Sequence, residues 1–249
     1  GNDKSQSYIS VATTNATGIM PNNDYDRYNF SFRNTTNFLN NKFILDTSAN
    51  YIIQNDKNMV SQGQYFNPLT SLYLFPRGED FSDVAVYERY DDLSGVNTQY
   101  WPYGDLGGVS SQNPYWIMNR MNRENDRRRY KLAASLQYNI IEGLNVQGRV
   151  SIDNTESKYT EKFHAGTVGN FAGPKGRYKE ENRLDRQVYA DVLANFNKTF
   201  NEFNVTANLG ASIKDLRMEL TSLHGDLNNV TNHFTIENLT RSGYYKVNA

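Results

Sequence analysis

The sequence predicts an all-β chain that forms part of an antiparallel, up-and-down transmembrane β-barrel. Three observations support this fold class: apolar residues recur at every second position in several segments, short and long connections alternate between these segments, and the segments have the length that a barrel strand needs to cross a membrane. Alternation with a period of two gives a strand one apolar face and one polar face, because successive side chains point to opposite sides.

The alternation is clearest between residues 130 and 152. Apolar side chains occupy every second position from Tyr130 to Ile140, and polar ones fill most of the positions between them. The pattern resumes after Glu142-Gly143, so this stretch is expected to be a hairpin. Seven segments follow the same rule and are predicted strands: 5–13, 26–37, 42–54, 130–140, 144–152, 186–198 and 203–214.

The connections between these strands alternate in length. Short turns are expected at residues 39–41, 141–143 and 201–202. Long connections are expected at residues 14–25, 55–125, 156–185 and from 221 onward. Outer-membrane barrels sort their connections in this way, with short turns on the periplasmic side and long loops outside. The segment 55–125 is therefore predicted to be one large external loop.

Strand length and aromatic placement favour the same fold. An apolar band of about 25 Å, crossed by tilted strands, needs about 9–11 residues per strand, which matches 130–140 and 144–152. Aromatic residues near the short turns are expected to form the periplasmic girdle, and Tyr28 and Tyr130 the outer one. The periplasmic group comprises Phe38, Phe43, Tyr138, Phe196, Phe200 and Phe203.

Composition limits the other possibilities. No run of eighteen apolar residues occurs, so no transmembrane helix is expected. The net charge of −1 gives no general attraction to nucleic acid. The absence of cysteine excludes disulfides and thiolate metal sites. One alternative stays open on the pattern alone: a soluble β-sandwich, whose half-buried strands also alternate.

Several stretches, taken in order, resemble a known family. They are DKSQSYIS, GIMPNNDYDRYNF, NPLTSLYLFPRGEDF, WPYG, QNPYWIMNR, LNVQGRVSIDN and VYADVLANFNKTFNEFNVTANLGAS. Together they resemble the SusC/RagA family of TonB-linked, or TonB-dependent, outer-membrane proteins of Bacteroidetes. The resemblance extends from about Gly1 to Ser212.

The resemblance implies a bacterial outer-membrane importer with a 22-stranded barrel. Such a protein takes up bulky nutrients, either oligosaccharides or peptides, with energy delivered by TonB through a plug domain. A SusD-like lipoprotein covers its external loops as a lid. Residues 1–249 contain no plug and no signal segment, and about seven strands cannot close such a barrel. We therefore expect a barrel fragment cut from a longer protein, facing outer-membrane lipid.

Catalysis is not expected. The three histidines, His164, His224 and His233, have no metal-ligand spacing. No pair of carboxylates stands out as a glycosidase acid and nucleophile. The sequence therefore predicts no enzyme, no metal and no cofactor. The alternative function is a soluble or surface-anchored glycan-binding β-sandwich that uses aromatic residues of the long loop.

Aromatic residues of the long loop are the candidate ligand or partner contacts. Exposed rings can stack on sugars or anchor a protein partner. A second interpretation is that these rings pack the loop onto itself, because a long ordered loop needs its own small core. The candidates are Trp101, Tyr103, Tyr115 and Trp116.

Charged residues on the predicted strands fall on both faces. By strand phase, Arg128 points outward with Tyr130, and it is a candidate contact for lipopolysaccharide phosphate; the alternative is a solvated rim charge. Another group is predicted to face the lumen, where charge is tolerated. This group comprises Arg33, Lys131, Arg149, Asp153, Asp191 and Lys214.

Overall fold

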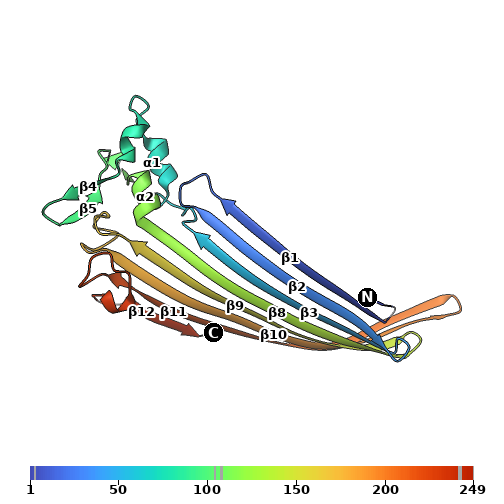
Figure 1. Ribbon diagram of the computed structural model, residues 1–249. Coiled ribbons are helices and arrows are strands. Elements are labelled where there is room, and N and C mark those ends of the chain that lie inside the picture. Colours follow the sequence, from blue (N-terminus) through green and yellow to red (C-terminus); the bar gives the residue numbers. More distant parts are fainter. Residues whose placement is uncertain (3, 104, 107–108, 241–242, 249) are drawn as a thin grey trace.

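One antiparallel sheet of eight strands forms the body of the protein (Figure 1). The computed structural model describes all residues except 3, 104, 107–108, 241–242 and 249. The strands are β1 (Ser5–Thr17), β2 (Asp24–Phe38), β3 (Phe43–Lys57), β8 (Met121–Ile141), β9 (Leu144–Phe163), β10 (Arg177–Phe200), β11 (Phe203–Asp226) and β12 (Gly243–Asn248).

The strands follow one another in the sheet as they do along the chain. The order is β1-β2-β3-β8-β9-β10-β11-β12, and every neighbouring pair is antiparallel. This up-and-down topology confirms the predicted fold class. The other sheets in the described part of the chain have two strands each, so no second layer completes a sandwich.

The strands are longer than predicted, and the connections are shorter. β8 begins at Met121 and not at residue 130, and β10 begins at Arg177 and not at residue 186. The β1–β2 and β9–β10 connections shrink to residues 18–23 and 164–176. The eighth strand, β12, occupies a segment predicted to be loop. Apolar alternation ends where both faces become polar, but backbone pairing continues beyond that point.

The short turns have a local cause. Leu39, Asn40 and Asn41 all have positive φ, and so does Asn201. Gly143 closes the β8–β9 turn at φ +83°. Glycine and asparagine adopt this left-handed region at low cost, so these sequences reverse the chain within a few residues.

A compact set of loops lies at the other end of the sheet (Figure 1). We call it the crown: the described residues of 58–120, 164–176 and 227–240. It contains α1 (Pro68–Leu74), η1 (Phe81–Ala85), β4 (Glu88–Asp91), β5 (Val96–Gln99), β6 (Asp105–Leu106), β7 (Val109–Ser110), α2 (Pro114–Arg120) and η2 (Ile236–Asn238). The predicted long loop is thus a folded unit.

Two Asn-Pro pairs start the crown helices. The side chain of Asn67 accepts a hydrogen bond from the Leu69 amide at 3.0 Å, and Asn113 accepts one from the Tyr115 amide at 2.9 Å. Proline follows each cap at the first helical position, where its missing N–H costs nothing.

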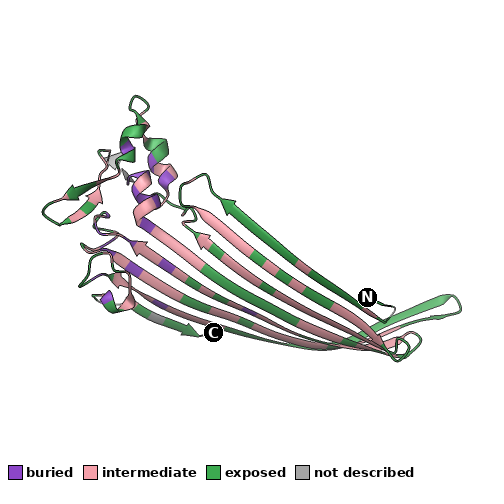
Figure 2. Cartoon of the chain, in the orientation of Figure 1, coloured by how far each residue is buried: buried purple, intermediate pink, exposed green. Residues whose placement is uncertain are grey.

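The crown also holds most of the fully buried residues (Figure 2). Its core joins α2 to the outer ends of β8 and β9 and to the 164–176 loop. The buried cluster is Trp116, Ile117, Met121, Phe163 and Ala172, with Phe66, Tyr87 and Phe171 packed against it. The large loop is therefore held in place by burial against the strand ends.

Candidate functional site

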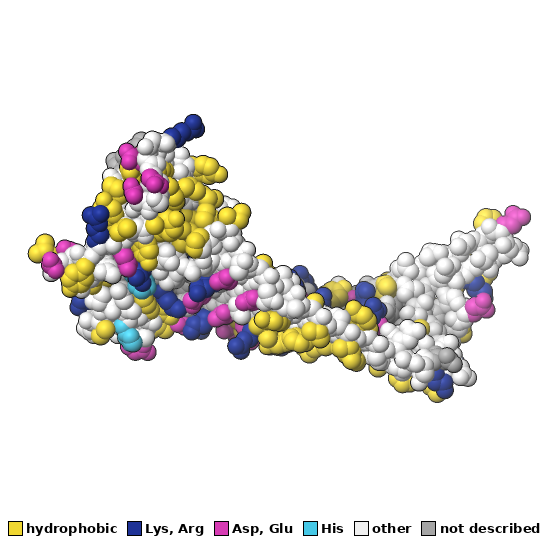
Figure 3. Space-filling view, turned by 45° about the horizontal axis from the view of Figure 1, so that its top comes forward, with side chains coloured by type: hydrophobic (Ala, Val, Ile, Leu, Met, Phe, Trp, Pro, Cys, Tyr) yellow, Lys and Arg dark blue, Asp and Glu magenta, His cyan; other side chains and the backbone are white. Residues whose placement is uncertain are grey.

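One face of the sheet is apolar and uncovered. Leu209 is 78% exposed and Ile213 is 71% exposed on β11, and Leu132, Leu136 and Val150 each lie near 46–47%. Figure 3 shows hydrophobic side chains along the sheet and over the crown. An exposed apolar surface of this extent marks contact with a membrane or with another protein. Separately, no helix among the described residues is long and apolar enough to cross a membrane.

Exposed aromatic side chains lie beside the short turns. Phe203 is 75% exposed, Phe200 49% and Phe38 44%. Nearer the crown, Tyr28 and Tyr130 lie on the same face and are 38% and 39% exposed. The aromatic residues thus bound the apolar face at two levels along the strands.

The opposite face is polar and carries ion pairs between neighbouring strands. Arg149 on β9 contacts Asp191 on β10 at 2.9 Å, and Arg129 contacts Asp153 at 2.6 Å. Arg33 contacts Asp46 at 2.8 Å.

All six residues predicted as lumen-facing belong to this polar face by strand register. Arg33, Arg149, Asp153 and Asp191 are in the ion pairs just described. Lys131 lies across from Asp153, and Lys214 lies across from Tyr189. Their partners Asp46 and Arg129 were not predicted. Both are offset diagonally from the residue they contact, so only the strand register could have identified them.

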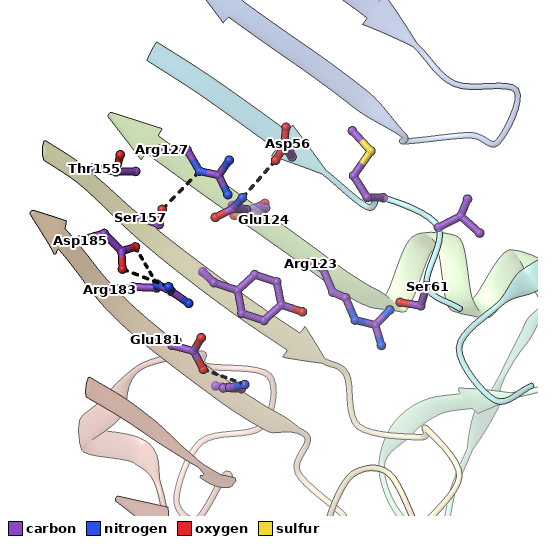
Figure 4. Close-up of a pocket in the computed structure, with 15 residues that line it drawn as sticks. Asp56, Ser61, Arg123, Glu124, Arg127, Thr155, Ser157, Glu181, Arg183 and Asp185 are labelled. Atoms are coloured by element: carbon purple, nitrogen blue, oxygen red, sulfur yellow. Dashed lines mark hydrogen bonds and ion pairs between the residues drawn. The ribbon is translucent and has the colours of Figure 1, made fainter. Parts of the chain in front are cut away.

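The outer half of the polar face, beside the crown, forms a pocket of about 790 Å³. Figure 4 shows side chains from β3, β8, β9 and β10 lining it, with Ser61 of the crown at one side. Its volume lies within the usual range of ligand sites. Most of its charges are paired internally: Arg183 with Asp185, Lys179 with Glu181, and Arg123 with Glu161.

Two charged residues of the pocket are exceptions. Arg127 donates one hydrogen bond, to Ser157 Oγ at 3.4 Å. Asp56 accepts hydrogen bonds from Asn125 at 3.0 Å and from Gln54 at 3.1 Å. Neither forms an ion pair with another described residue. They supply one cation and one anion that a bound molecule could neutralise.

An ion pair and a neutral histidine connect the parts of the crown. Arg120 donates to both carboxylate oxygens of Glu88, at 2.8 and 2.9 Å, and these bonds hold the pKa of Glu88 below its usual value. Burial lowers the pKa of His164 to about 4, assisted by the positive charge of Arg120. The neutral ring packs edge-on against Phe234 at 5.0 Å.

Among the described residues, no group of three or more His, Asp or Glu side chains could hold a metal ion. His164 lies between the long loop and the C-terminal loop of the crown, so its role is in packing.

The four aromatic candidates have different environments. Trp116 is fully buried, and its Nε1 donates to Thr167 Oγ1 at 3.0 Å. The expectation that Trp116 contacts a ligand is therefore wrong, because its indole completes the crown core. Tyr115 stacks with Tyr87. Trp101 and Tyr103 are half-buried around Phe75, and Trp101 Nε1 donates to Ser111 Oγ at 2.8 Å.

Arg128 is exposed on the same face as Tyr130, at the crown side of the apolar region. It borders an open cavity of about 490 Å³ that spans β8 to β11. Other residues at this cavity include Glu156, Lys158, Leu184 and Glu219. Its contact with lipid stays a prediction.

Comparison with solved structures supports the barrel fold. The chain matches "Structure of the RagAB peptide importer in the 'closed-closed' state" with a TM-score of 0.67 and 14% identity. It matches "Structure of the RagAB peptide transporter" with 0.67 and 13%, and the importer in the 'open-open' state with 0.68 and 14%. Each match covers 100% of this chain and 27% of the solved chain.

No family model and no curated protein matches the sequence. The chain spans about a quarter of the length of the solved structures, and its eight strands leave the sheet open. The similarity thus confirms, at the level of fold, the resemblance found in the sequence. The chain has the fold of a segment of the solved RagAB importer structures.

Proposed function

We propose that this chain forms part of the barrel wall and the outer loops of a TonB-dependent importer of bulky nutrients in the bacterial outer membrane. The observation that carries the proposal is the single-layer sheet with an exposed apolar face and an ion-paired polar face. Lipid would cover the first face, and the second would line the polar lumen. TonB would act through a plug domain outside these 249 residues.

The pocket on the polar face is the proposed substrate contact. A peptide carries an ammonium group and a carboxylate, which complement the two charged residues without ion pairs, Asp56 and Arg127. A neutral oligosaccharide has no such charges and would use the hydroxyl and amide groups of Ser157, Thr155 and Asn125. The unpaired charges favour a peptide, and the similar solved structures are those of the RagAB peptide importer and peptide transporter.

The crown is the proposed contact for a SusD-like lipoprotein lid. Tyr73 on α1 is 83% exposed and Leu93 is 98% exposed. Tyrosine is a typical anchor of a protein interface, and large exposed apolar side chains mark contact surfaces. The half-buried Trp101, Tyr103 and Tyr115 would support this surface and contact the lid or substrate at its edge.

An import assay with the full-length protein in cells tests the substrate assignment. Arg127→Gln is expected to slow uptake of a peptide with a free carboxylate at least fivefold, because a charged hydrogen bond contributes about 1.5–3 kcal/mol. Uptake of the same peptide with an amidated C-terminus should change much less. Arg77→Gln, which removes an exposed crown cation, is the control. Equal slowing of both peptides, or of neither, would remove Arg127 from the site.

Co-purification tests the lid surface separately. Tyr73→Asp should reduce the amount of lipoprotein that purifies with the full-length protein, whereas Tyr8→Asp, on the β1 edge, should not. Unchanged recovery with Tyr73→Asp would place the lid elsewhere.

A further inference from the structure

Five positive side chains lie at nearly the same height on five consecutive strands. They are Lys57 on β3, Arg128 on β8, Lys158 on β9, Arg186 on β10 and Arg217 on β11. We call these five residues the cation belt. The strand ends beside the short turns are Phe43, Ile141, Leu144, Phe200 and Phe203, in the same order. Each member of the belt lies about 14 residues from that end of its own strand, so the five lie at similar distances from the short turns.

All five side chains share the outer, apolar face of the sheet. Each lies an even number of residues from an apolar residue of its strand, so both side chains point to the same face. Lys57 comes four residues after Ile53. Arg128 comes two residues before Tyr130, and Arg186 two residues before Val188. All five are exposed. No charged residue shares this face between the belt and the aromatic level at the turns in 43–56, 129–141 or 187–197. On these three strands, β3, β8 and β10, the belt therefore ends an uncharged surface.

The height of the belt is that of lipid headgroups. A strand rises about 3.3 Å per residue, and at a tilt of about 40° it climbs about 2.5 Å per residue. The belt therefore lies about 35 Å above the turn end of the strands, against an apolar band of about 25 Å. If the difference between these two lengths is divided equally between the two membrane interfaces, the belt lies about 5 Å beyond the outer hydrocarbon boundary.

Three members of the belt have no partner within the described part of the chain. Lys57, Arg128 and Arg186 form no ion pair and no side-chain hydrogen bond there. The other two reach toward the crown: Lys158 contacts Glu180 at 3.2 Å, and Arg217 contacts Glu219 at 2.5 Å.

Carboxylates near the belt set its limits. Glu156 and Asp215 lie two residues nearer the turns on β9 and β11. On β2 the same height is held by Asp24, with Asp26 below it, so the belt stops at β3. At the belt and at the level two residues nearer the turns, five cations on β3 and β8–β11 share the face with two carboxylates. Two more carboxylates, Asp126 on β8 and Glu219 on β11, lie two residues nearer the crown.

We propose, on the basis of the proposed function, that the cation belt binds the phosphate groups of outer-leaflet lipopolysaccharide. Guanidinium groups match phosphate through paired N–H donors, and Lys and Arg near an anionic membrane surface each add to binding. The open cavity beside Arg128, lined by residues of β8 to β11, gives a headgroup room on the surface of the sheet. This extends the single contact expected for Arg128 to a lipid-binding surface across five strands.

Lipid retention by the full-length protein tests the belt. The triple variant Lys57→Gln, Arg128→Gln, Arg186→Gln is purified from outer membranes in mild detergent, and bound lipopolysaccharide is counted by native mass spectrometry. Affinity should fall about a hundredfold, since each cation contributes a factor of about five. A control variant with Lys4→Gln, Lys42→Gln and Arg77→Gln makes the same charge change away from the belt, and it should retain lipid.

Single variants and competition by inorganic phosphate distinguish a lipopolysaccharide site from a site for free phosphate. Arg128→Lys should keep most of the binding, and Arg128→Gln alone should weaken it even if the triple variant does not fold. Inorganic phosphate at about 1 mM should not displace the lipid. Displacement at that level would indicate a site for free phosphate and would overturn the proposal. Equal retention by the triple variant and the wild type would also overturn it.

A fluorescent probe on the apolar face distinguishes an error in the lipid-binding proposal from an error in the proposed function. A fluorophore on Leu136→Cys should be quenched by brominated lipid, and one on Gln137→Cys should not. Quenching at Leu136, together with unchanged lipid retention, refutes the belt alone. Absence of quenching at Leu136 refutes the membrane assignment itself.

Discussion

The rings of Phe43 and Tyr138 stack at 4.6 Å between centroids, with 13° between their planes. Phe43 begins β3 and Tyr138 lies near the end of β8, so the pair joins two strands that the crown segment 58–120 separates along the chain. The contact lies on the apolar face beside the short turns. It therefore fixes the register of the strand pair with the largest sequence separation between neighbours.

A double-mutant cycle on this pair should show coupling. Phe43→Ala and Tyr138→Ala together are expected to give a coupling free energy of about 0.5–1.5 kcal/mol in urea unfolding from lipid vesicles, because stacked rings contribute about that much beyond buried area. Phe43→Ala with Tyr130→Ala, further along β8, should show none. Equal coupling in the two cycles would contradict a specific stack.

Gly143 should tolerate no side chain. Its φ is +83°, and a Cβ there would overlap the carbonyl oxygen of Asn197 on β10. Gly143→Ala is expected to destabilise the protein by about 1–3 kcal/mol in the same unfolding experiment. Gly78→Ala is the control, because nothing lies within 4 Å of the place that an added methyl group would take and its φ is not left-handed. A stable Gly143→Ala variant would mean that this turn differs in solution.

Substitution of Trp116 should lower the stability of the crown, whereas substitution of Tyr103 should weaken binding. Trp116→Ala removes a fully buried ring and its hydrogen bond to Thr167, at a cost of about 3–5 kcal/mol to the crown. Hydrogen exchange of the 164–176 loop should rise accordingly. Tyr103→Ala should leave that exchange nearly unchanged and weaken only lid or substrate binding. The reverse result would contradict the packing described for both residues.

Acidification should lower the stability of the crown before it affects the stability of the strands. The pKa of His164 is about 4 in the folded protein and about 6.5 when unfolded, so the unfolded form gains the proton first as pH falls. Stability is constant above about pH 6.5 and falls by about 1–2 kcal/mol by about pH 5, because solvent screens part of the effect at a partly exposed ring. Glu88, whose pKa is lowered by Arg120, adds a loss only below about pH 4.5.

Hydrogen exchange of crown amides at pH 7 and pH 5, corrected for intrinsic rates, measures this loss. His164→Phe should remove most of the difference between the two pH values. A difference that persists in that variant would assign it to another group.

The strand cores could be predicted from the sequence, and their extensions could not. Between Tyr130 and Ile140 one face is apolar, so the alternation identifies both the strand and the direction of each side chain. From Met121 to Arg129 both faces carry polar or charged residues, and the periodic signal disappears although β8 continues. Backbone hydrogen bonds hold that part together, and a single sequence does not reveal which residues pair.

The starts of the crown helices have local signals in the sequence that do not depend on apolar alternation. Asn67-Pro68 and Asn113-Pro114 mark the starts of α1 and α2 by the ordinary cap rules. The burial of Trp116 could not be predicted, because it depends on Phe163 and Ala172 from distant segments. The same is true of Arg129 and Asp153, whose diagonal pairing follows from register.

Lipid exposure along one strand tests the central claim most directly. These 249 residues contain no cysteine, so each position from Tyr130 to Ile140 can be replaced singly by cysteine and labelled with a fluorophore. The label is placed in the full-length, membrane-embedded protein after any cysteine elsewhere in it has been replaced by serine. Quenching by brominated lipid should alternate, strong at Leu132, Ala134 and Leu136 and weak at Ala133, Ser135 and Gln137. Uniform quenching, or an alternation of the opposite phase, would contradict a lipid-facing barrel wall.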